Sequence, residues 1–314
     1  MKNKRAWFTF PYVIWMALFV VIPILIMAVY AFTTVDPLTS ATLPTLGNFT
    51  GMGLYASVFL RSFWLALLAT LVCLLIGYPV SYWMAKEGPR FQRMAMALIM
   101  LPMWMNFLLR TYSWMSILEN NGLLNQLFQN IGVIDLHNSI GAWFTGLRNS
   151  IAIHFAEDPE QFVPAVYHPI RYFQLIGTPG AVVLGMVYNY LPFMILPIYS
   201  VIVKLDGSLI EAARDLGADS ARVFSKVIFP LSLPGILSGV TMVFVPSVST
   251  FAISSLLGGG TQMMLGDLIE AQFLGGAYNP HLGAAISMVM MVIVVVCMVV
   301  MNHFGEGEEQ AVML

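Results

Sequence analysis

Six long apolar runs constrain the fold of this chain more than any other feature of its sequence. A helix needs about 20 mostly apolar residues to cross the hydrocarbon core of a membrane, and each run is at least that long. Polar stretches, or stretches rich in Gly and Pro, separate the runs, as is typical of loops between spans. The sequence predicts an all-α membrane protein with transmembrane helices near residues 9–32, 61–85, 94–118, 178–203, 232–256 and 281–303.

The composition agrees with a membrane protein and excludes several other classes. Of the 314 residues, 59% are apolar and 10% are charged, whereas soluble domains carry about 25% charged residues. A net charge of −2 argues against nucleic acid as a partner. Cys73 and Cys297 both fall within apolar runs, so we interpret them as small buried side chains rather than as a disulfide or a metal site.

The N-terminal run is predicted to be a retained first transmembrane helix. It begins after a basic start at residues 1–5 and continues from Trp7 to Phe32. Secretory signals have a shorter apolar region of about 7–15 residues and a small-residue cleavage site, which this chain lacks. We therefore divide the chain into a first helix with its outer loop (1–60), a membrane core (61–303) and a cytoplasmic tail (304–314).

The distribution of basic residues predicts that both termini are cytoplasmic. Lys and Arg are enriched in cytoplasmic loops of membrane proteins. If the N-terminus is inside, ten of the 14 basic residues fall on the inner side and four, namely Arg61, Arg110, Arg148 and Arg171, fall on the outer side or at outer helix ends.

The longest outer loop, about residues 119–177, contains an amphipathic segment. Apolar residues recur there at helical spacing: Ile140, Trp143, Phe144, Leu147, Ile151 and Phe155. We expect a helix over 139–156, capped by Asn138 or Ser139, that lies on the membrane surface or packs on the outer domain. The acidic residues that follow, Glu157, Asp158 and Glu160, either attract a cationic solute or keep the loop solvated.

The inner loop between the fourth and fifth spans predicts two short helices that meet at a glycine. Ser208 and Glu211 have capping-box spacing, so a helix should run from Leu209 to about Leu216. Gly217 then supplies the left-handed conformation that ends it. Asp219 or Ser220 can cap a second helix before Pro230 and the next span.

Such an elbow has the properties of a docking surface. Ala212 and Ala213 are small enough for another protein to approach the backbone closely, and Val223 and Phe224 offer an apolar anchor. An ordinary cytoplasmic linker with incidental caps has the same spacing, so the pattern alone leaves both readings open.

The same segment resembles the conserved loop of type I ABC importer permeases. That loop reads E-A-A, three residues, Gly, and a stretch ending in Pro, which Glu211, Ala212, Ala213, Gly217 and Pro230 match in register. The resemblance implies the six-span type I permease fold, with this loop as the coupling helix that sits in a groove of a cytoplasmic ATPase subunit. It implies coupling roles for Glu211, Ala212, Ala213, Gly217, Val223 and Phe224.

A narrower resemblance, to the polyamine permeases of that family, extends over most of the chain. The segments that carry it are IGYPVSYWMAK (76–86), LPMWMNFLLRTY (101–112), GVID (132–135), GMVYNYLPFMILPIYS (185–200) and KLDGSLIEAARDLGA (204–218). Residues 139–172 depart from the pattern and look like an insertion. The resemblance implies a bacterial inner membrane location and a complex with a second permease, two ATPase subunits and an extracytoplasmic polyamine-binding protein. ATP and magnesium would bind the ATPase, and this chain would hold no cofactor.

A path for polyamines requires aromatic faces for cation–π contacts and oxygen atoms for the ammonium groups. Aromatic residues also form the interfacial belt of membrane proteins, which is the alternative role for each candidate. Trp104 resembles a position implicated in polyamine permeases. The candidates within the spans are Trp104, Tyr112, Tyr188 and Tyr190.

Charged residues give a second set of candidates. Asp267 and Glu270 are three residues apart, hence on one helical face, where they either admit a cation at the outer gate or face water. Arg110 has the wrong sign for a polyamine, so we expect it to snorkel outward or to pair with Glu119. Because no carboxylate falls deep within a predicted span, any deep anionic contact must come from the partner permease.

Two other functions compete with polyamine import. The same architecture carries other solutes, such as an amino acid, thiamine or ferric ion. A membrane enzyme would need clustered acids, histidines or a nucleophile at membrane depth, whereas the five histidines here are scattered over loops and span ends. The chain also lacks a G-x-x-x-x-G-K-[ST] phosphate loop, so it has no ATPase site of that kind.

Overall fold

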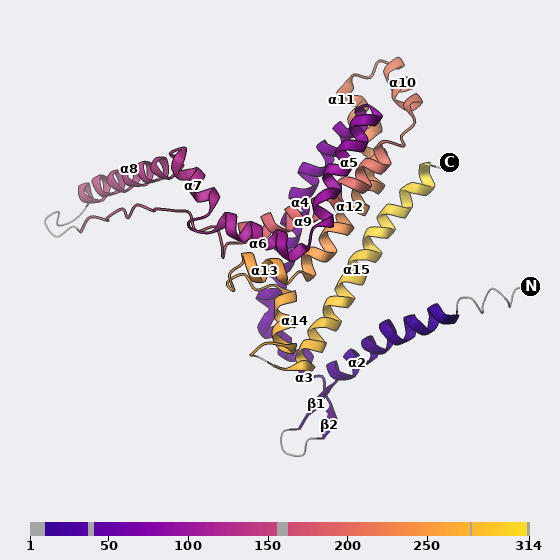
Figure 1. Ribbon diagram of the computed structural model, residues 1–314, viewed down its shortest axis with the longest axis horizontal. Helices are drawn as coiled ribbons and strands as arrows, with labels where there is room; N and C mark the ends of the chain where they lie inside the picture. Colours follow the sequence, from indigo (N-terminus) through magenta and orange to yellow (C-terminus); the bar gives the residue numbers. More distant parts are fainter. Residues whose placement is uncertain (1–9, 37–40, 156–162, 277, 313–314) are drawn as a thin grey trace, which may run out of the picture.

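The computed structural model describes residues 10–36, 41–155, 163–276 and 278–312, which form a mostly helical molecule (Figure 1). In chain order its elements are η1 (Ala17–Val21), α2 (Ile22–Ala31), β1 (Thr33–Val35), β2 (Thr42–Pro44), α3 (Gly47–Gly51), η2 (Met52–Tyr55), α4 (Ala56–Lys86), α5 (Pro89–Trp104), α6 (Phe107–Leu118), α7 (Leu123–Asn130), α8 (Val133–His154), α9 (Pro179–Ile202), α10 (Gly207–Asp215), α11 (Ser220–Val223), η4 (Phe224–Ile228), α12 (Phe229–Ser249), α13 (Ala252–Leu257), α14 (Leu265–Phe273) and α15 (Pro280–Val312).

The helices confirm a multi-span membrane protein. Within the described residues, five helices are long and apolar enough to cross a membrane: Phe10–Ala31, Gly47–Lys86, Pro179–Ile202, Ser220–Ser249 and Pro280–Met301. A sixth span is present if α5 and the helical segment Phe107–Asn130 are counted together, although the two are bent by 91°.

The third span is broken, so the prediction of one continuous helix over 94–118 is wrong. Pro102 lacks the N–H that would continue the backbone hydrogen bonds of α5, which ends at Trp104. Asn106 then starts a new helix, because its side chain accepts hydrogen bonds from the backbone N–H groups of Leu108 (2.8 Å) and Leu109 (3.4 Å).

The fifth span also differs from its predicted bounds of 232–256. It begins at Ser220, because α11 and η4 continue without a break into α12. It ends at Ser249, because Thr250 adopts an extended backbone conformation (φ −63°, ψ 142°). Residues 252–257 form the separate short helix α13.

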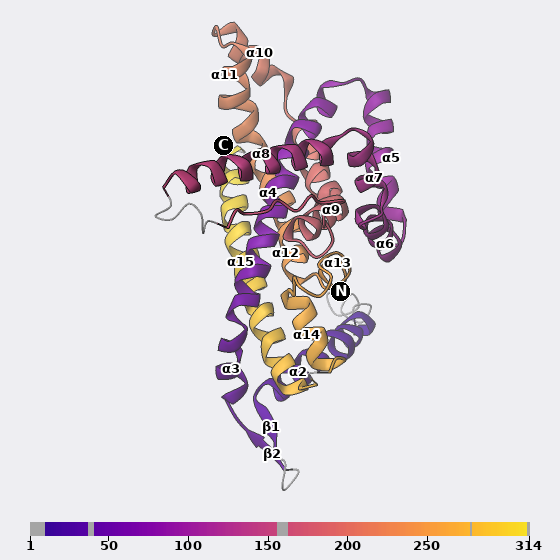
Figure 2. The same ribbon diagram turned by 90° about the vertical axis from the view of Figure 1, so that its left-hand side faces the viewer.

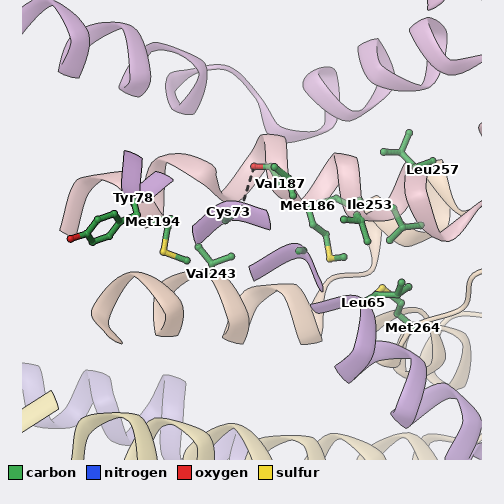
Figure 3. Packing of buried hydrophobic residues seen from close by; sticks show 14 of the residues in the cluster. Leu65, Cys73, Tyr78, Met186, Val187, Met194, Val243, Ile253, Leu257 and Met264 are labelled. Atoms are coloured by element: carbon green, nitrogen blue, oxygen red, sulfur yellow. Dashed lines mark hydrogen bonds between the residues drawn. The ribbon is translucent and has the colours of Figure 1, made fainter. Parts of the chain in front are cut away.

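The main core lies where α4, α9 and α12 pack together (Figure 3). Gly239 allows α12 to approach α9 closely, because a Cβ atom there would lie 3.1 Å from the backbone oxygen of Met194. Ser81 joins α4 to α9 by donating a hydrogen bond to the carbonyl of Ile195 (3.0 Å). Cys73 is buried in this core as a free thiol, and Cys297 is a partly buried free thiol.

A second core cluster lies at the end of the bundle opposite the loop formed by α10 and α11 (Figures 1 and 2). There α14 packs against the start of α15, and β1 pairs antiparallel with β2, with Thr34 opposite Leu43. The N-terminal span, Phe10–Ala31, packs on the start of α15 at its C-terminal end and diverges from the bundle toward its N-terminal end (Figure 1), and none of its most apolar window is buried. Its surface is therefore available to lipid or to another subunit.

The predicted amphipathic helix is present but begins earlier than expected. It starts at Val133, after Gly132 in the left-handed conformation (φ 75°), so neither Asn138 nor Ser139 caps it. Instead, Asn138 lies within α8 and makes two hydrogen bonds, both 2.9 Å, to the backbone of Ile170 in the returning chain. Asn149 holds Ala165 in the same way.

Side chains on the opposite side of α8 remain exposed, and they are the apolar residues that predicted the helix: Ile140, Trp143, Phe144, Leu147, Ile151 and Phe155. The arm formed by α7 and α8 reaches away from the bundle (Figure 1). The acidic residues Glu157, Asp158 and Glu160 lie outside the described residues.

Candidate coupling loop and solute path

The coupling loop begins with α10, whose first turn is capped by Asp206. The Asp206 carboxylate accepts a hydrogen bond from the backbone N–H of Ser208 (2.9 Å). The Ser208 backbone N–H and hydroxyl hold the pKa of this carboxyl below its usual range, because they favour its charged form. The predicted capping box of Ser208 and Glu211 is therefore wrong by two residues, since Asp206 takes the capping position.

Gly217 ends α10 in the predicted left-handed conformation, with φ +83°. The N–H of Gly217 donates to Arg214 (2.8 Å) and that of Ala218 donates to Ala213 (3.0 Å), which satisfies carbonyls at the helix end. A Cβ atom at Gly217 would meet nothing within 4 Å, so backbone conformation rather than space requires glycine. Asp219 caps α11 as predicted, accepting from the N–H of Arg222 (2.8 Å).

Val223 and Phe224 anchor this loop to the protein's own spans. Val223 is only 3% exposed. The Phe224 ring packs edge-on against Tyr82 and Tyr78 of α4, with centroids 5.3 and 5.9 Å apart. The expectation that these two side chains present an outward apolar anchor is therefore corrected, because they are directed into the bundle.

The outward surface of the loop is formed by α10 instead. Glu211 and Ala212 are exposed and Ala213 is half-buried. Leu216, directly before the elbow, is 89% exposed, and sequence reasoning missed it as a contact candidate. An apolar residue between the polar end of α10 and Gly217 was the available signal. The loop projects from one end of the bundle (Figures 1 and 2).

The four aromatic path candidates do not form one cluster. Trp104 is 84% exposed at the break in the third span, and Tyr112 is 47% exposed on α6. Tyr188 is partly buried and packs edge-on against Trp114 of α6, with centroids 5.4 Å apart. Tyr190 is also partly buried and interacts with the Thr250 side chain at the break after α12. The two tyrosines of α9 thus belong to the packed interior.

Asp267 and Glu270 are brought together in a cleft of about 290 Å³. Asp267 Oδ2 accepts from the N–H of Met264 (2.8 Å), whereas its Oδ1 is buried without a partner in the described part of the chain. Burial raises the pKa of Asp267 to about 6. The other lining residues are Ser254, Ser255, Gly260, Met263, Ala271, Leu274 and Gly275. This cleft combines carboxylates and hydroxyls with apolar side chains.

Residues 77–306 match the family described as "binding-protein-dependent transport system inner membrane component". The chain belongs to this family. It is therefore a multi-pass inner membrane permease subunit and not an enzyme.

Two curated relatives cover most of the permease. The spermidine/putrescine transport system permease protein PotB of Escherichia coli (strain K12) is 36% identical over 282 residues, which is 89% of this chain and 90% of that protein. The inner membrane ABC transporter permease protein YdcU of the same strain is 26% identical over 280 residues, 87% of this chain and 81% of that protein.

A solved structure shows the same fold. It is a bacterial ABC transporter involved in the import of the acidic polysaccharide alginate, with a TM-score of 0.67 at 16% sequence identity. The match covers 97% of each chain. At this identity the likeness concerns the fold alone, which is that of the type I ABC importer permeases.

Proposed function

We propose that this chain is a permease subunit of an ATP-driven importer of polyamines such as spermidine and putrescine. The observation that carries the proposal is the 36% identity to PotB over 89% of the chain. An alignment of that extent includes both breaks in the spans and the coupling loop together, rather than one motif.

The cleft around Asp267 and Glu270 has the chemistry that a polyamine requires. Two carboxylates and the hydroxyls of Ser254 and Ser255 are acceptors for ammonium groups. Met263 and Leu274 line the same cleft and suit the methylene segments between those groups. We propose Asp267 and Glu270 as an outer contact for the solute, with Trp104, Tyr112, Tyr188 and Tyr190 as further candidates along the path.

In the proposed complex, a second permease resembling PotC completes the path. One of two ATPase subunits binds the α10 elbow, where Glu211 and Ala212 are exposed, Leu216 is almost fully exposed and Ala213 is half-buried. The two ATPase subunits hold ATP and magnesium. An extracytoplasmic polyamine-binding protein delivers the solute. Both termini are cytoplasmic, because ten of the 14 basic residues then lie on the inner side.

Uptake by vesicles that contain the reconstituted complex tests the substrate directly. Labelled spermidine and putrescine should accumulate only with ATP on the ATPase side, and each should compete with the other. An excess of an amino acid, thiamine or ferric ion should leave uptake unchanged. ATP-dependent uptake of one of these solutes without uptake of polyamines would keep the architecture and overturn the substrate.

A further inference from the structure

Polar atoms without hydrogen-bond partners gather around one short helix, α13. Among the described residues, four buried side-chain atoms lack a partner: Nε and Nη1 of Arg110, Oδ1 of Asn189 and Oδ1 of Asp267. These residues lie on α6, α9 and α14, and each of these three helices packs against α13 (Figure 1). Because such atoms are few in native structures, their concentration at one place requires an explanation.

Arg110 is covered by helices of its own chain. Its side chain is 8% exposed, and it lies on the side of α6 that packs against α9 and α13. Glu119 lies past the opposite end of α6, so the expectation that Arg110 snorkels outward or pairs with Glu119 is wrong for this chain. Partners for its Nε and Nη1 atoms must therefore come from this chain itself.

Asn189 lies on the side of α9 that faces α13, and it is only 2% exposed. Its Nδ2 atom donates to the carbonyl of Gly185 (2.9 Å), whereas its Oδ1 atom accepts nothing from the described residues. Gly185 is one turn earlier on the same side of α9. A Cβ atom at Gly185 would lie 2.8 Å from the Cγ2 methyl of Ile253, so α13 is the element next to this side.

The backbone on both sides of α13 separates it from the long helices. Thr250 is extended and ends α12 before it, and Gly259 and Gly260 follow it with positive φ angles of 54° and 75°. No side chain caps the start of α13, although its first three residues are buried. The N–H groups of a first helical turn have no partner within the helix. A six-residue helix between two such breaks can shift without moving a span.

The unpaired groups around α13 are complementary. The Arg110 nitrogens and the N–H groups at the start of α13 are donors, whereas Asn189 Oδ1 and Asp267 Oδ1 are acceptors. Leaving buried donors and acceptors unpaired is unfavourable. Because both kinds lie around the same helix and the four side-chain atoms are closed off from the surface, a shift of that helix is the change that pairs them.

Ser254 connects α13 to the solute cleft. Its hydroxyl lines the cleft and lies beside the Asp267 carboxyl. It nevertheless donates to the carbonyl of Phe251 (3.0 Å), which leaves Asp267 Oδ1 unpaired. A cation that binds Asp267 therefore acts directly on a residue of α13.

We propose that α13 has a second position in the transport cycle, in which Asn189 and Arg110 gain hydrogen-bond partners, and that solute at Asp267 favours this position. The inference rests on the proposed function for the identity of the solute. An ammonium group at Asp267 pairs with Oδ1 and displaces Ser254, and Asn189 Oδ1 then accepts from an N–H group at the start of the shifted α13. The solute stabilises the second position because it binds Asp267 more tightly there. Asn189 and Arg110 are thus residues of the transport cycle rather than of the core.

The first experiment measures thermal unfolding and ATP-dependent spermidine uptake of complexes with Asn189→Leu or Arg110→Met. Each change removes unpaired buried atoms, so the melting temperature should rise by about 2 °C or more. Uptake should fall about tenfold, because the observed position of α13 is then favoured over the second one. A lower melting temperature for both variants would overturn the proposal, and so would wild-type uptake by both.

Asn125→Leu is the matched control. Asn125 is 1% exposed, like Asn189, but its amide is fully paired. Its Nδ2 atom donates to the carbonyls of Glu119 (3.1 Å) and Phe173 (3.0 Å), and its Oδ1 atom accepts from the N–H of Phe173 (2.9 Å). Loss of these bonds should lower the melting temperature, as expected for a purely structural residue.

A second experiment follows α13 itself by hydrogen exchange of residues 250–261 in the purified complex. Spermidine should accelerate exchange of this segment in the wild type, because α13 leaves its observed contacts, and should have little effect in Asn189→Leu. Unchanged exchange at a spermidine concentration that saturates uptake would overturn the proposal. Failure of the proposed substrate is distinguishable, because the wild-type complex would then not take up spermidine. The higher melting temperature of Asn189→Leu does not depend on the solute.

Discussion

The two ends of the bundle are built in different ways. At the coupling end, the interactions that shape α10 and α11 join residues two to five positions apart: Asp206 with Ser208, Asp219 with Arg222, and Ala213 with Ala218. At the opposite end, α14 is held by contacts between distant segments. The N–H of Leu265, for example, donates to Ser62 Oγ (2.8 Å), 203 positions earlier in the chain.

This difference separates two functions. A loop whose shape is encoded locally keeps that shape while the spans move, as a coupling element for an ATPase requires. A cleft such as that of Asp267 combines α13 and α14 and rests on α4, so it changes when those helices shift. The coupling end should therefore respond to backbone substitutions, and the opposite end to changes in side-chain chemistry.

The largest expected effect is from Gly217→Val at the coupling end. A β-branched residue at φ +83° is strained by about 1–3 kcal/mol. At the upper limit this strain corresponds to roughly a hundredfold loss of substrate-stimulated ATP hydrolysis. Substrate-stimulated ATP hydrolysis by the complex should fall while membrane insertion survives. Gly207→Ala is the control, because Gly207 begins α10 in open space. Normal coupled transport by the Val variant would contradict a locally shaped elbow.

Trp104→Leu should have the next largest effect and should spare the ATPase. Loss of one cation–π contact of about 1–2 kcal/mol reduces polyamine uptake roughly five- to thirtyfold. Trp104→Phe should retain part of the activity, since a smaller aromatic face remains. Initial uptake rates at subsaturating polyamine and matched expression measure the difference. If Trp104 contacts only lipid, the Leu variant will transport as well as wild type.

Asp267→Asn should reduce uptake about threefold, as expected for loss of one partly exposed charge. It should also raise the melting temperature. The pKa of Asp267 is raised from 3.8 to about 6 in the fold, because ionisation of this carboxyl is unfavourable there. The folded state is therefore stabilised while the carboxyl is protonated. That contribution to the free energy of unfolding is complete below the pKa of the unfolded chain, and it is lost as the pH rises through about 6. Wild-type uptake should decline below about pH 6, where this carboxyl becomes protonated.

Glu270→Gln is the control for the stability part of that prediction. Glu270 is exposed, so its neutralisation should leave the melting temperature unchanged. Thermal unfolding of the purified complex, followed in parallel with uptake, separates the two effects. A lower melting temperature for Asp267→Asn would show that the carboxylate stabilises the fold rather than the solute.

The smallest expected effect is from Asp206→Ala. Loss of the cap costs about 1 kcal/mol of helix stability, but Gly217 and the Asp219 cap still define the elbow. Coupled ATP hydrolysis should fall by about twofold. Asp206→Asn, which keeps an acceptor for the Ser208 N–H, should restore it. A loss as large as that of Gly217→Val would mean that one cap alone holds the loop.

Much of this architecture was predictable from local patterns. The apolar runs predicted the spans, Gly217 predicted the left-handed elbow, and Asp219 was named as one of two candidate caps. The break in the third span and the separate helix α13 were not predicted, and the errors at the helix starts are shifts along the chain. Asp206 precedes Ser208 and takes the capping position, and Gly132 starts α8 before Asn138 can.

The sequence by itself determined which stretches are apolar enough for a membrane, where the left-handed elbow at Gly217 lies and which residue caps α11, because these properties depend on neighbouring residues. Only the tertiary structure decided that Arg110 is buried, that Val223 and Phe224 face the bundle and that Asp267 lies in a cleft. Those facts depend on which helix packs on which face. The sequence of one chain specifies the polarity of each face, whereas the neighbour that covers it comes from residues up to 251 positions away.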